Sequence, residues 1–256
     1  MPVIAFTNQK GGVGKTTSAV NVAAELARAG HPTLLVDLDP QANASSGLGI
    51  RDAAAGTYEL LMGEQSVPEL TQATAIGGLE VLPASEDLSG AEVELSGAEG
   101  RYVRLARKLT NHPYRYVIVD CPPSLGFLSI NAMVAARYVV IPVQCEYYAL
   151  EGLSRLSDTL RKVKRSLNPD LDLLGVLLTM YDKRLNLSRQ VADDVRRHFP
   201  ERTFETIVPR SVRLAEAPSH GQAAGMFARL SRGATAYADV AKEVHEHAEQ
   251  RAWQRA

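Results

Sequence analysis

Short apolar runs and longer stretches of helical periodicity alternate along this chain. The apolar runs predict strands at Val3–Thr7, Thr33–Val36, Leu79–Leu82, Tyr116–Val119, Tyr138–Ile141, Leu173–Thr179 and Thr203–Val208. The periodic stretches predict helices at Lys15–Arg28, Arg101–Leu109, Leu150–Leu167, Leu187–Phe199 and Ala234–Arg251. Because most of the apolar runs lack polar alternation, they are typical of strands buried on both faces. The pattern therefore predicts an α/β fold, a doubly wound and mostly parallel sheet with helices on both faces, which binds ligands at the carboxyl ends of its strands.

Composition adds limits to this fold. The chain has 256 residues, of which 45% are hydrophobic and 22% charged, so we expect one globular domain over residues 1–256. No apolar run is long enough to cross a membrane, and no basic leader precedes Val3. Two cysteines, Cys121 and Cys145, are too few for a disulfide framework and lack the spacing of a zinc site. We expect a cytoplasmic protein.

Charge is distributed unevenly, although the formal net charge is only −1. Residues 46–100 contain ten acidic side chains and one basic side chain, so this segment should repel polyanions. Residues 183–232 contain ten basic side chains and five acidic ones. The second segment is therefore the better candidate for contact with a polyanion such as nucleic acid.

A glycine-rich loop lies between the first predicted strand and the first predicted helix. Glycines let consecutive backbone N–H groups surround an anion, and the helix N-terminus adds partial positive charge. In this geometry Lys15 reaches the β- and γ-phosphates of a nucleotide, Thr16 coordinates Mg²⁺, and Thr17 donates to a more distant phosphate. The candidate nucleotide-binding residues of the loop are Lys10, Gly11, Gly12, Val13, Gly14, Lys15, Thr16 and Thr17.

Carboxylates follow two other predicted strands. The string DLDPQ ends one strand with Asp37 and Asp39, and YVIVD ends another with Asp120. An apolar strand that closes on an acid is the Walker B arrangement, so Asp120 is a predicted Mg²⁺ partner. Asp39 is a second candidate partner for the metal and for an attacking water. We expect Asp37 to hold the loop in shape.

The ordinary phosphate-loop pattern requires glycine where this chain has Gln9, and the string KGGVGKTT stands there instead. That string resembles the deviant Walker A loop of the ParA/MinD group of P-loop ATPases. The resemblance implies that Lys10 reaches the phosphates of a partner subunit in a nucleotide-sandwich dimer. It also implies that Asp39, in a string like the family's switch I segment, positions the hydrolytic water, which makes Lys10, Lys15 and Asp39 the predicted catalytic residues.

Two further strings, VIPVQCEYYALEGL and IVPRSVRLAEAPSHG, resemble the chromosomal ParA proteins, also called Soj, that segregate bacterial DNA with ParB. The resemblance covers Val3 to about Val244. It implies an ATP- and Mg²⁺-dependent dimer, nucleoid-associated, that binds DNA without sequence preference and hydrolyses ATP slowly until ParB stimulates it. The family's DNA contacts map to Arg184 and Arg213. Its base contacts map to Thr179, Met180, Pro209 and Arg210.

Two alternatives share the loop. A MinD-like membrane-associated positioning ATPase needs a C-terminal amphipathic anchor, whereas Ala241–Ala256 offers only Val244 and Trp253 as large apolar residues among mixed charges. We therefore expect no membrane partner. An electron-transfer ATPase like the nitrogenase iron protein needs two cysteines per protomer for a shared cluster, and the context of Cys121 and Cys145 is not that family's.

Overall fold

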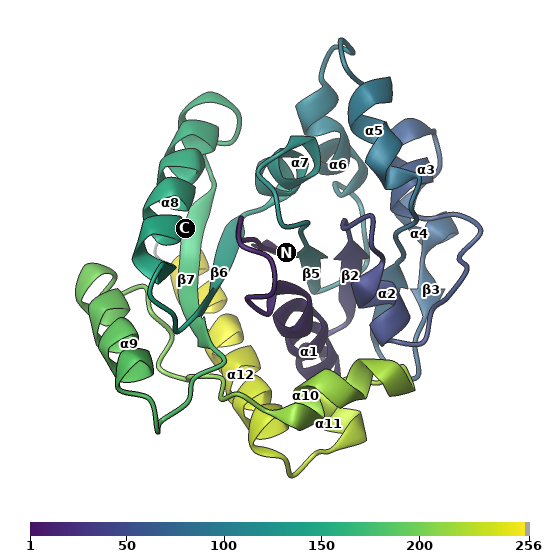
Figure 1. The fold of residues 1–256 in the computed structure, drawn as a ribbon. Coiled ribbons are helices and arrows are strands. Elements are labelled where there is room, and N and C mark those ends of the chain that lie inside the picture. The colour runs from purple at the N-terminus through teal and green to yellow at the C-terminus, as the bar shows by residue number, and fades with distance from the viewer. Residues whose placement is uncertain (254–256) are drawn as a thin grey trace.

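Seven strands form one sheet in the computed structural model, which describes residues 1–253 (Figure 1). Their order across the sheet is β3-β4-β2-β5-β1-β6-β7, and every neighbouring pair is parallel except β3 with β4. The strands are β1 (Val3–Phe6), β2 (Thr33–Asp37), β3 (Gln72–Ala73), β4 (Leu79–Leu82), β5 (Tyr116–Asp120), β6 (Tyr138–Gln144) and β7 (Asp172–Thr179). The predicted doubly wound α/β sheet is confirmed.

Helices cover both faces of this sheet (Figure 1). In chain order they are α1 (Lys15–Arg28), α2 (Asn43–Gly47), α3 (Thr57–Met62), α4 (Val67–Leu70), α5 (Leu88–Glu94), η1 (Arg101–Val103), α6 (Arg104–Lys108), α7 (Phe127–Ala135), α8 (Ala149–Ser166), α9 (Asn186–His198), α10 (Val212–Glu216), η2 (Ala217–His220), α11 (Ala224–Phe227) and α12 (Arg232–Trp253). Strand residues alternate between the two cores, because successive side chains point to opposite faces. On β1, Val3 and Ala5 belong to the core that contains α7 and α8, whereas Ile4 and Phe6 belong to the core that contains α1 and α12.

Parallel pairing brings the carboxyl ends of three central strands together. Asp37, the last residue of β2, is the register partner of Asp120, the last residue of β5. Phe6, at the end of β1, is also paired with Asp120, and β1 leads directly into the glycine loop. The sheet thus places the phosphate-loop candidates and the acidic candidates at one edge, as expected for this topology.

The prediction of a strand at Thr203–Val208 is wrong. The segment runs beside β7 and makes isolated bridges, with Phe204 N donating to Val176 O at 3.0 Å and Val208 N to Leu178 O at 2.9 Å. Between these points the carboxylate of Glu243 on α12 accepts hydrogen bonds from the N–H groups of residues 205 and 206, both at 2.8 Å. Those donors are therefore lost to the sheet, and the ladder is interrupted.

Several helices were not predicted. Helix α7 is almost entirely buried between the sheet and its neighbours, so its sequence lacks the polar face that makes a helix visible as a periodic pattern. Helices α3 to α5 lie in the acidic segment and α2 borders it, and all four are short, at four to seven residues. The predicted helix at Arg101–Leu109 begins as the 3₁₀ turn η1 and becomes α-helical only at Arg104.

Candidate functional site

The glycine loop has the backbone shape of an anion cradle. Gly12 and Gly14 have φ of +73° and +85°, a region that favours glycine, and Gly14 is the N-cap of α1. The loop is connected to β7, the strand at one edge of the sheet, because the hydroxyl of Thr179 at the end of that strand donates a hydrogen bond to Val13 O at 2.8 Å. The N-terminus of α1 therefore opens toward whatever occupies the loop, and it favours negative charge there.

Lys15 is the first residue of α1 and is only 6% exposed. Its ammonium donates to Lys10 O at 3.1 Å, so the side chain folds back under the loop. Burial lowers the pKa of Lys15, while the nearby Asp120 carboxylate, the Cys121 thiol and Asp39 act in the opposite direction. A buried cation beside the loop and close to carboxylates is suited to a phosphate group that bears more than one negative charge.

Three aspartates occupy the floor and wall of the same region. Asp37 is fully buried and accepts hydrogen bonds from Ser45 N at 2.8 Å and from the Ser45 hydroxyl at 2.7 Å. Burial raises the pKa of Asp37 to about 6, against the lowering effect of these bonds. Asp39 is 7% exposed, and its carboxylate accepts Gln41 N at 3.0 Å, which fixes the turn that presents it.

Asp120 is different, because neither of its fully buried carboxylate oxygens accepts a hydrogen bond in the described chain. Burial raises its pKa well above the usual value, and Asp37 raises it further, while the nearby Thr16 hydroxyl and Lys15 ammonium oppose the shift. A buried carboxylate with unused acceptors needs a cation or a water shell.

These residues fit Mg²⁺, which prefers oxygen ligands and retains several waters. Thr16 supplies a hydroxyl at the start of α1, and the unused oxygens of Asp120 lie beside it. Within residues 1–253 there is no cluster of three or more His, Cys, Asp or Glu side chains that forms a metal cage. A Mg²⁺ ion at this place would therefore take most of its remaining ligands from water and from phosphate oxygens.

Two hollows that share several lining residues extend from the loop. The first, with a volume of about 510 Å³, is lined by Gly11, Gly12, Gly14, Lys15, Thr16, Thr17, Asp39 and Met180 among the predicted residues. The second, of about 320 Å³, contains the predicted base contacts Thr179, Met180, Pro209 and Arg210. Val13 of the loop and Asp120 at the end of β5 are buried, both at 1% exposure or less. The structure thus brings together predicted residues from five separate stretches of sequence, namely the glycine loop, Asp39, Asp120, Thr179–Met180 and Pro209–Arg210.

The second hollow is the more apolar of the two and contains all four of the predicted base contacts. Its wall includes Met180, whose φ of +51° is strained for a residue with a side chain. A bridge between Tyr181 and Pro209 joins the two strand-end segments behind it, and Arg210 N donates to Tyr181 O at 3.0 Å. Backbone strain retained at a pocket wall is common at ligand sites.

Several lining residues were missed from the sequence. They come from α2 and from residues 214–222, namely Gln41, Asn43, Ser46, Gly47, Leu214, Ala215, Ala217, Pro218 and Gln222, together with Val20 and Asn21 of α1 and Tyr237 of α12. One polar contact explains how the late segment reaches the site, since Asn21 Oδ1 accepts Ala224 N at 2.8 Å. A buried asparagine in the middle of a helix is the sequence signal that could have indicated such a docking contact.

Lys10 lies apart from the other loop residues. Its side chain does not line either hollow; the ammonium instead pairs with Glu146 Oε2 at 2.7 Å, with both side chains 46% exposed. Lys10 N is held by Asn8 Oδ1 at 3.1 Å. Lys10 therefore points to the rim of the site, whereas Lys15 points under the loop.

The two predicted DNA-contact arginines are exposed and lie on adjoining segments. Arg184 is three residues past Tyr181 and Arg213 four residues past Pro209, the two residues that form the isolated bridge described above. Each has one acidic neighbour, with Arg184 Nη2 2.6 Å from Asp182 Oδ2 and Arg213 Nη1 2.8 Å from Glu216 Oε2. Their side chains are 82% and 59% exposed, so both are accessible to a large ligand.

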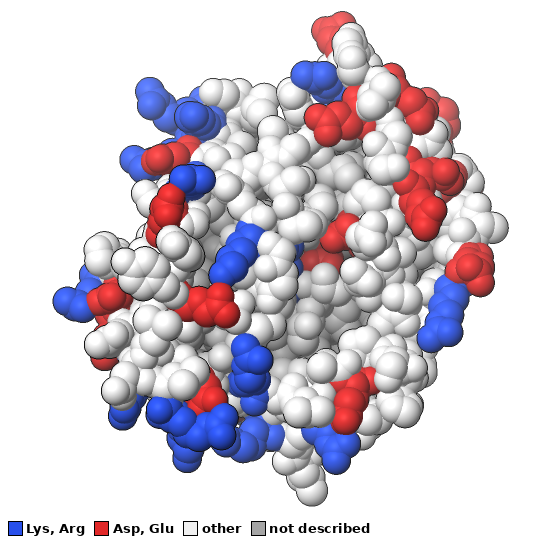
Figure 2. All heavy atoms as spheres, viewed as in Figure 1, with Lys and Arg blue, Asp and Glu red and all other residues white. Residues whose placement is uncertain are grey.

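The uneven charge of the sequence is also an uneven surface. Figure 2 shows Asp and Glu gathered at the upper right, where Figure 1 places α3 and α5, and most Lys and Arg at the left and lower left, around α8 and α9. The upper right of this face is thus mainly acidic, whereas the left and lower left carry most of the basic side chains with several acidic ones among them, and the predicted DNA contacts fall in the basic segment of the sequence.

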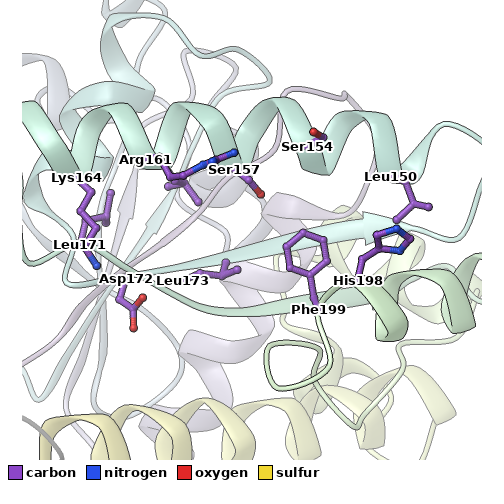
Figure 3. Close-up of a pocket in the computed structure, with 11 residues that line it drawn as sticks. Leu150, Ser154, Ser157, Arg161, Lys164, Leu171, Asp172, Leu173, His198 and Phe199 are labelled. Atoms are coloured by element: carbon purple, nitrogen blue, oxygen red, sulfur yellow. The ribbon is translucent and has the colours of Figure 1, made fainter.

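A larger hollow of about 650 Å³ lies between α8 and α9, away from the glycine loop (Figure 3). Its floor is apolar, with Leu171, Leu173 and Phe199, and the α8 side carries Ser157, Arg161 and Lys164. None of the predicted nucleotide or metal residues lines it. The predicted phosphate and metal residues that line a hollow are found in the first two hollows, not in this one.

Fold and site together define a P-loop nucleotide-binding protein with an additional lysine in its loop. One family model, described as an AAA domain, matches residues 1–173. The sporulation initiation inhibitor protein Soj of Bacillus subtilis is 53% identical over 94% of this chain and 97% of its own length. The chromosome-partitioning ATPase Soj of Thermus thermophilus is also 53% identical, over 94% of both chains.

Among solved structures, a cobyrinic acid a,c-diamide synthase of Mycobacterium smegmatis with a bound ATP analogue and magnesium aligns with a TM-score of 0.87 at 37% identity, over 96% of this chain and 95% of the other. The chain belongs to the Soj/ParA family of chromosome-partitioning ATPases. The predicted family and its class of enzyme are thereby confirmed. In residues 1–253, no helix has the length and apolar character needed to cross a membrane.

Proposed function

We propose that this chain is a Mg²⁺-dependent ATPase whose nucleotide state controls self-association and, through it, binding to DNA. The observation that carries the proposal is the meeting of the glycine loop, Lys15, Thr16, Asp39 and the unpartnered Asp120 carboxylate at one sheet edge. The relatives that match nearly the whole chain are chromosome-partitioning proteins and ATPases by name, which supports the ATPase part of the proposal.

In the proposed mechanism, backbone N–H groups of the loop and the Lys15 ammonium bind the β- and γ-phosphates. Thr16 and Asp120 hold Mg²⁺, with Asp39 close by; the ion neutralises phosphate charge when it is bound. Asp39, whose carboxylate is fixed by Gln41 N, orients the attacking water. Since such ATPases turn over slowly without an activator, we expect basal hydrolysis at roughly 10⁻⁴ to 10⁻² per second.

Lys10 belongs to a second copy's site in this proposal. Its ammonium lies at the rim of the site and outside both hollows of its own chain. The phosphates that it could contact are therefore those of a nucleotide bound to a facing copy. Two copies facing each other over two nucleotides double the number of DNA contacts from residues such as Arg184 and Arg213. Because each phosphate contact releases counterions, doubling the contacts makes DNA affinity depend steeply on ATP.

A ParB-type protein is the proposed activator, and duplex DNA without sequence preference is the proposed nucleic acid. Membrane attachment is not favoured, since the large apolar residues of α12 other than Trp253 are packed into the core against α1. The test compares Mg²⁺·ATP with ADP in gel filtration with light scattering, DNA binding and liposome pelleting. We expect dimers and DNA binding with ATP alone; equal DNA binding in both nucleotides, or pelleting with liposomes, would refute the proposal.

A further inference from the structure

The side chain of Lys10 has a fixed partner within its own chain. Its ammonium contacts Glu146 Oε2 at 2.7 Å, and the other carboxylate oxygen of Glu146 accepts a hydrogen bond from Gln144 Nε2. Both oxygens of Glu146 are therefore used. The pair leaves Lys10 without any part in the hollows that Gly12 and Lys15 line.

The two halves of this ion pair are held by neighbouring strands. Lys10 follows β1, with its backbone fixed by Asn8, and Glu146 follows β6, which is hydrogen-bonded to β1 in the sheet. The turn that carries Glu146 is closed at both ends, by Glu146 N donating to Gln144 O at 2.8 Å and Ala149 N donating to Glu146 O at 3.0 Å. The pair therefore joins two segments that are already in place, and it costs little chain entropy to form.

The same turn presents an unusual surface. Tyr147 and Tyr148 are 76% and 66% exposed and meet edge to face at 5.2 Å between ring centroids. Exposed neighbouring aromatic side chains are typical of protein contact surfaces. The ion pair of Lys10 thus lies beside a surface suited to contact with another protein.

We propose that Glu146 is the resting counter-ion of Lys10 and that a second copy's nucleotide must displace it before the dimer closes. This inference rests on the proposed sandwich dimer, because it gives Lys10 a competing anion in the same chain. A triphosphate carries several negative charges and displaces one carboxylate; a diphosphate without the γ-phosphate offers less charge to compete with it. Glu146 is therefore a regulatory residue that raises the threshold for self-association without contacting the nucleotide.

The size of the effect follows from exposure. A half-exposed ion pair contributes about 0.2–1 kcal/mol, and the symmetric dimer breaks two of them. Removal of the carboxylate charge should therefore strengthen the ATP-dependent dimer by roughly 2- to 30-fold. The affinity of a single copy for ATP should not change.

The experiment is sedimentation velocity over a range of protein concentrations with Mg²⁺ and a non-hydrolysable ATP analogue. Glu146→Gln is the test variant. Glu151→Gln is the matched control, because Glu151 forms a similarly exposed pair with Arg155 at 2.6 Å one turn along the same segment. We expect a 2- to 30-fold lower dimer dissociation constant for Glu146→Gln and no change for Glu151→Gln. In a Lys10→Gln background, adding Glu146→Gln should have no further effect.

Three results would overturn the inference: equal or weaker dimers with Glu146→Gln, an equal gain with Glu151→Gln, or a gain that persists without Lys10. If the wild-type protein and Glu146→Gln both stay monomeric with the ATP analogue, the sandwich dimer itself is refuted, which separates that failure from the others. Dimers formed by Glu146→Gln at concentrations where the wild type is monomeric would support both proposals.

Discussion

Asp37 holds Ser45 by two hydrogen bonds at once, one from the backbone N–H at 2.8 Å and one from the hydroxyl at 2.7 Å. The Ser45 hydroxyl also accepts Ala84 N at 3.2 Å, and Asp37 Oδ1 accepts Asp39 N at 3.2 Å. One buried carboxylate thus fixes the loop that carries Asp39 and connects it to the end of β4. Ser45 and Asp37 are positioning residues, since they act on the site through Asp39.

Ser45→Ala should therefore lower kcat for ATP hydrolysis several-fold while leaving the KM for ATP nearly unchanged. The loss of the hydroxyl leaves Asp37 and Ala84 N short of a partner, which should reduce the free energy of unfolding by about 1–3 kcal/mol. Steady-state kinetics and urea unfolding measure the two effects. Ser89→Ala is the control, since the Ser89 hydroxyl donates to Glu86 O at 2.8 Å on the exposed acidic segment. A KM that rises in step with a falling kcat would contradict the positioning role.

Asp120→Asn should stabilise the nucleotide-free protein relative to the wild type, increasingly so as the pH rises above about 4. The pKa of Asp120 is raised in the folded chain, so the folded state binds a proton that the unfolded state has released, and wild-type stability falls with pH through that window. The asparagine removes this fall. Chemical unfolding of both proteins at several pH values measures it, and the difference cancels contributions from the histidines.

The same variant should lose the gain in stability that Mg²⁺·ATP gives the wild type, because the Asp120 oxygens, which accept no hydrogen bond in the described chain, are the proposed metal ligands. Thermal unfolding with and without Mg²⁺ tests this. Equal stabilisation of both proteins by Mg²⁺·ATP would show that the metal lies elsewhere.

Gly14→Ala should weaken nucleotide binding by roughly 5- to 30-fold. Gly14 has φ of +85° at the N-cap of α1, a conformation that costs an alanine about 1–2 kcal/mol. An added Cβ would lie 3.8 Å from Thr179 Cγ2, so backbone strain and not a clash is the cause. Gly77→Ala is the control, because a Cβ there meets nothing within 4 Å and its φ is not positive. Calorimetric titration with Mg²⁺·ATP compares the two.

Arg184→Ala and Arg213→Ala should each weaken DNA binding to a similar degree on unrelated sequences. Each should lower the slope of log affinity against log salt by about one, since a phosphate contact is lost. Arg155→Ala, an exposed arginine paired with Glu151 on α8, is the control. Unchanged slopes for the first two variants, measured by fluorescence anisotropy from 50 to 200 mM salt, would remove these arginines from the interface.

Local sequence patterns were sufficient for six of the seven strands and for the glycine loop between β1 and α1, whereas the two-residue strand β3 (Gln72–Ala73) was not predicted. The strands that end at Phe6, Asp37 and Asp120 are short apolar runs followed by the residues that carry the chemistry, so both the element and its function are local. The failures arose where a distant side chain decides the structure. Glu243 takes the backbone donors of residues 205 and 206, and nothing within that segment indicates this.

The rest of the site could not be predicted for a similar reason. Gln222 and Leu214 line the hollow because Asn21 anchors residue 224 from a helix 203 positions earlier in the chain. The pairing of Lys10 with Glu146 spans 136 positions and joins two strand ends whose adjacency is known only once the strand order is fixed. The loop motif identified Lys10 as a functional residue but did not indicate Glu146 as its partner.

The bridge between Tyr181 and Pro209 has a mechanical consequence. It joins the two segments that carry Arg184 and Arg213, three and four residues away, and the same segments line the second hollow at Met180 and Pro209. Under the proposed function, the base contacts and the DNA contacts thus share one stretch of backbone, and the path between a bound nucleotide and a bound duplex is only a few peptide units long.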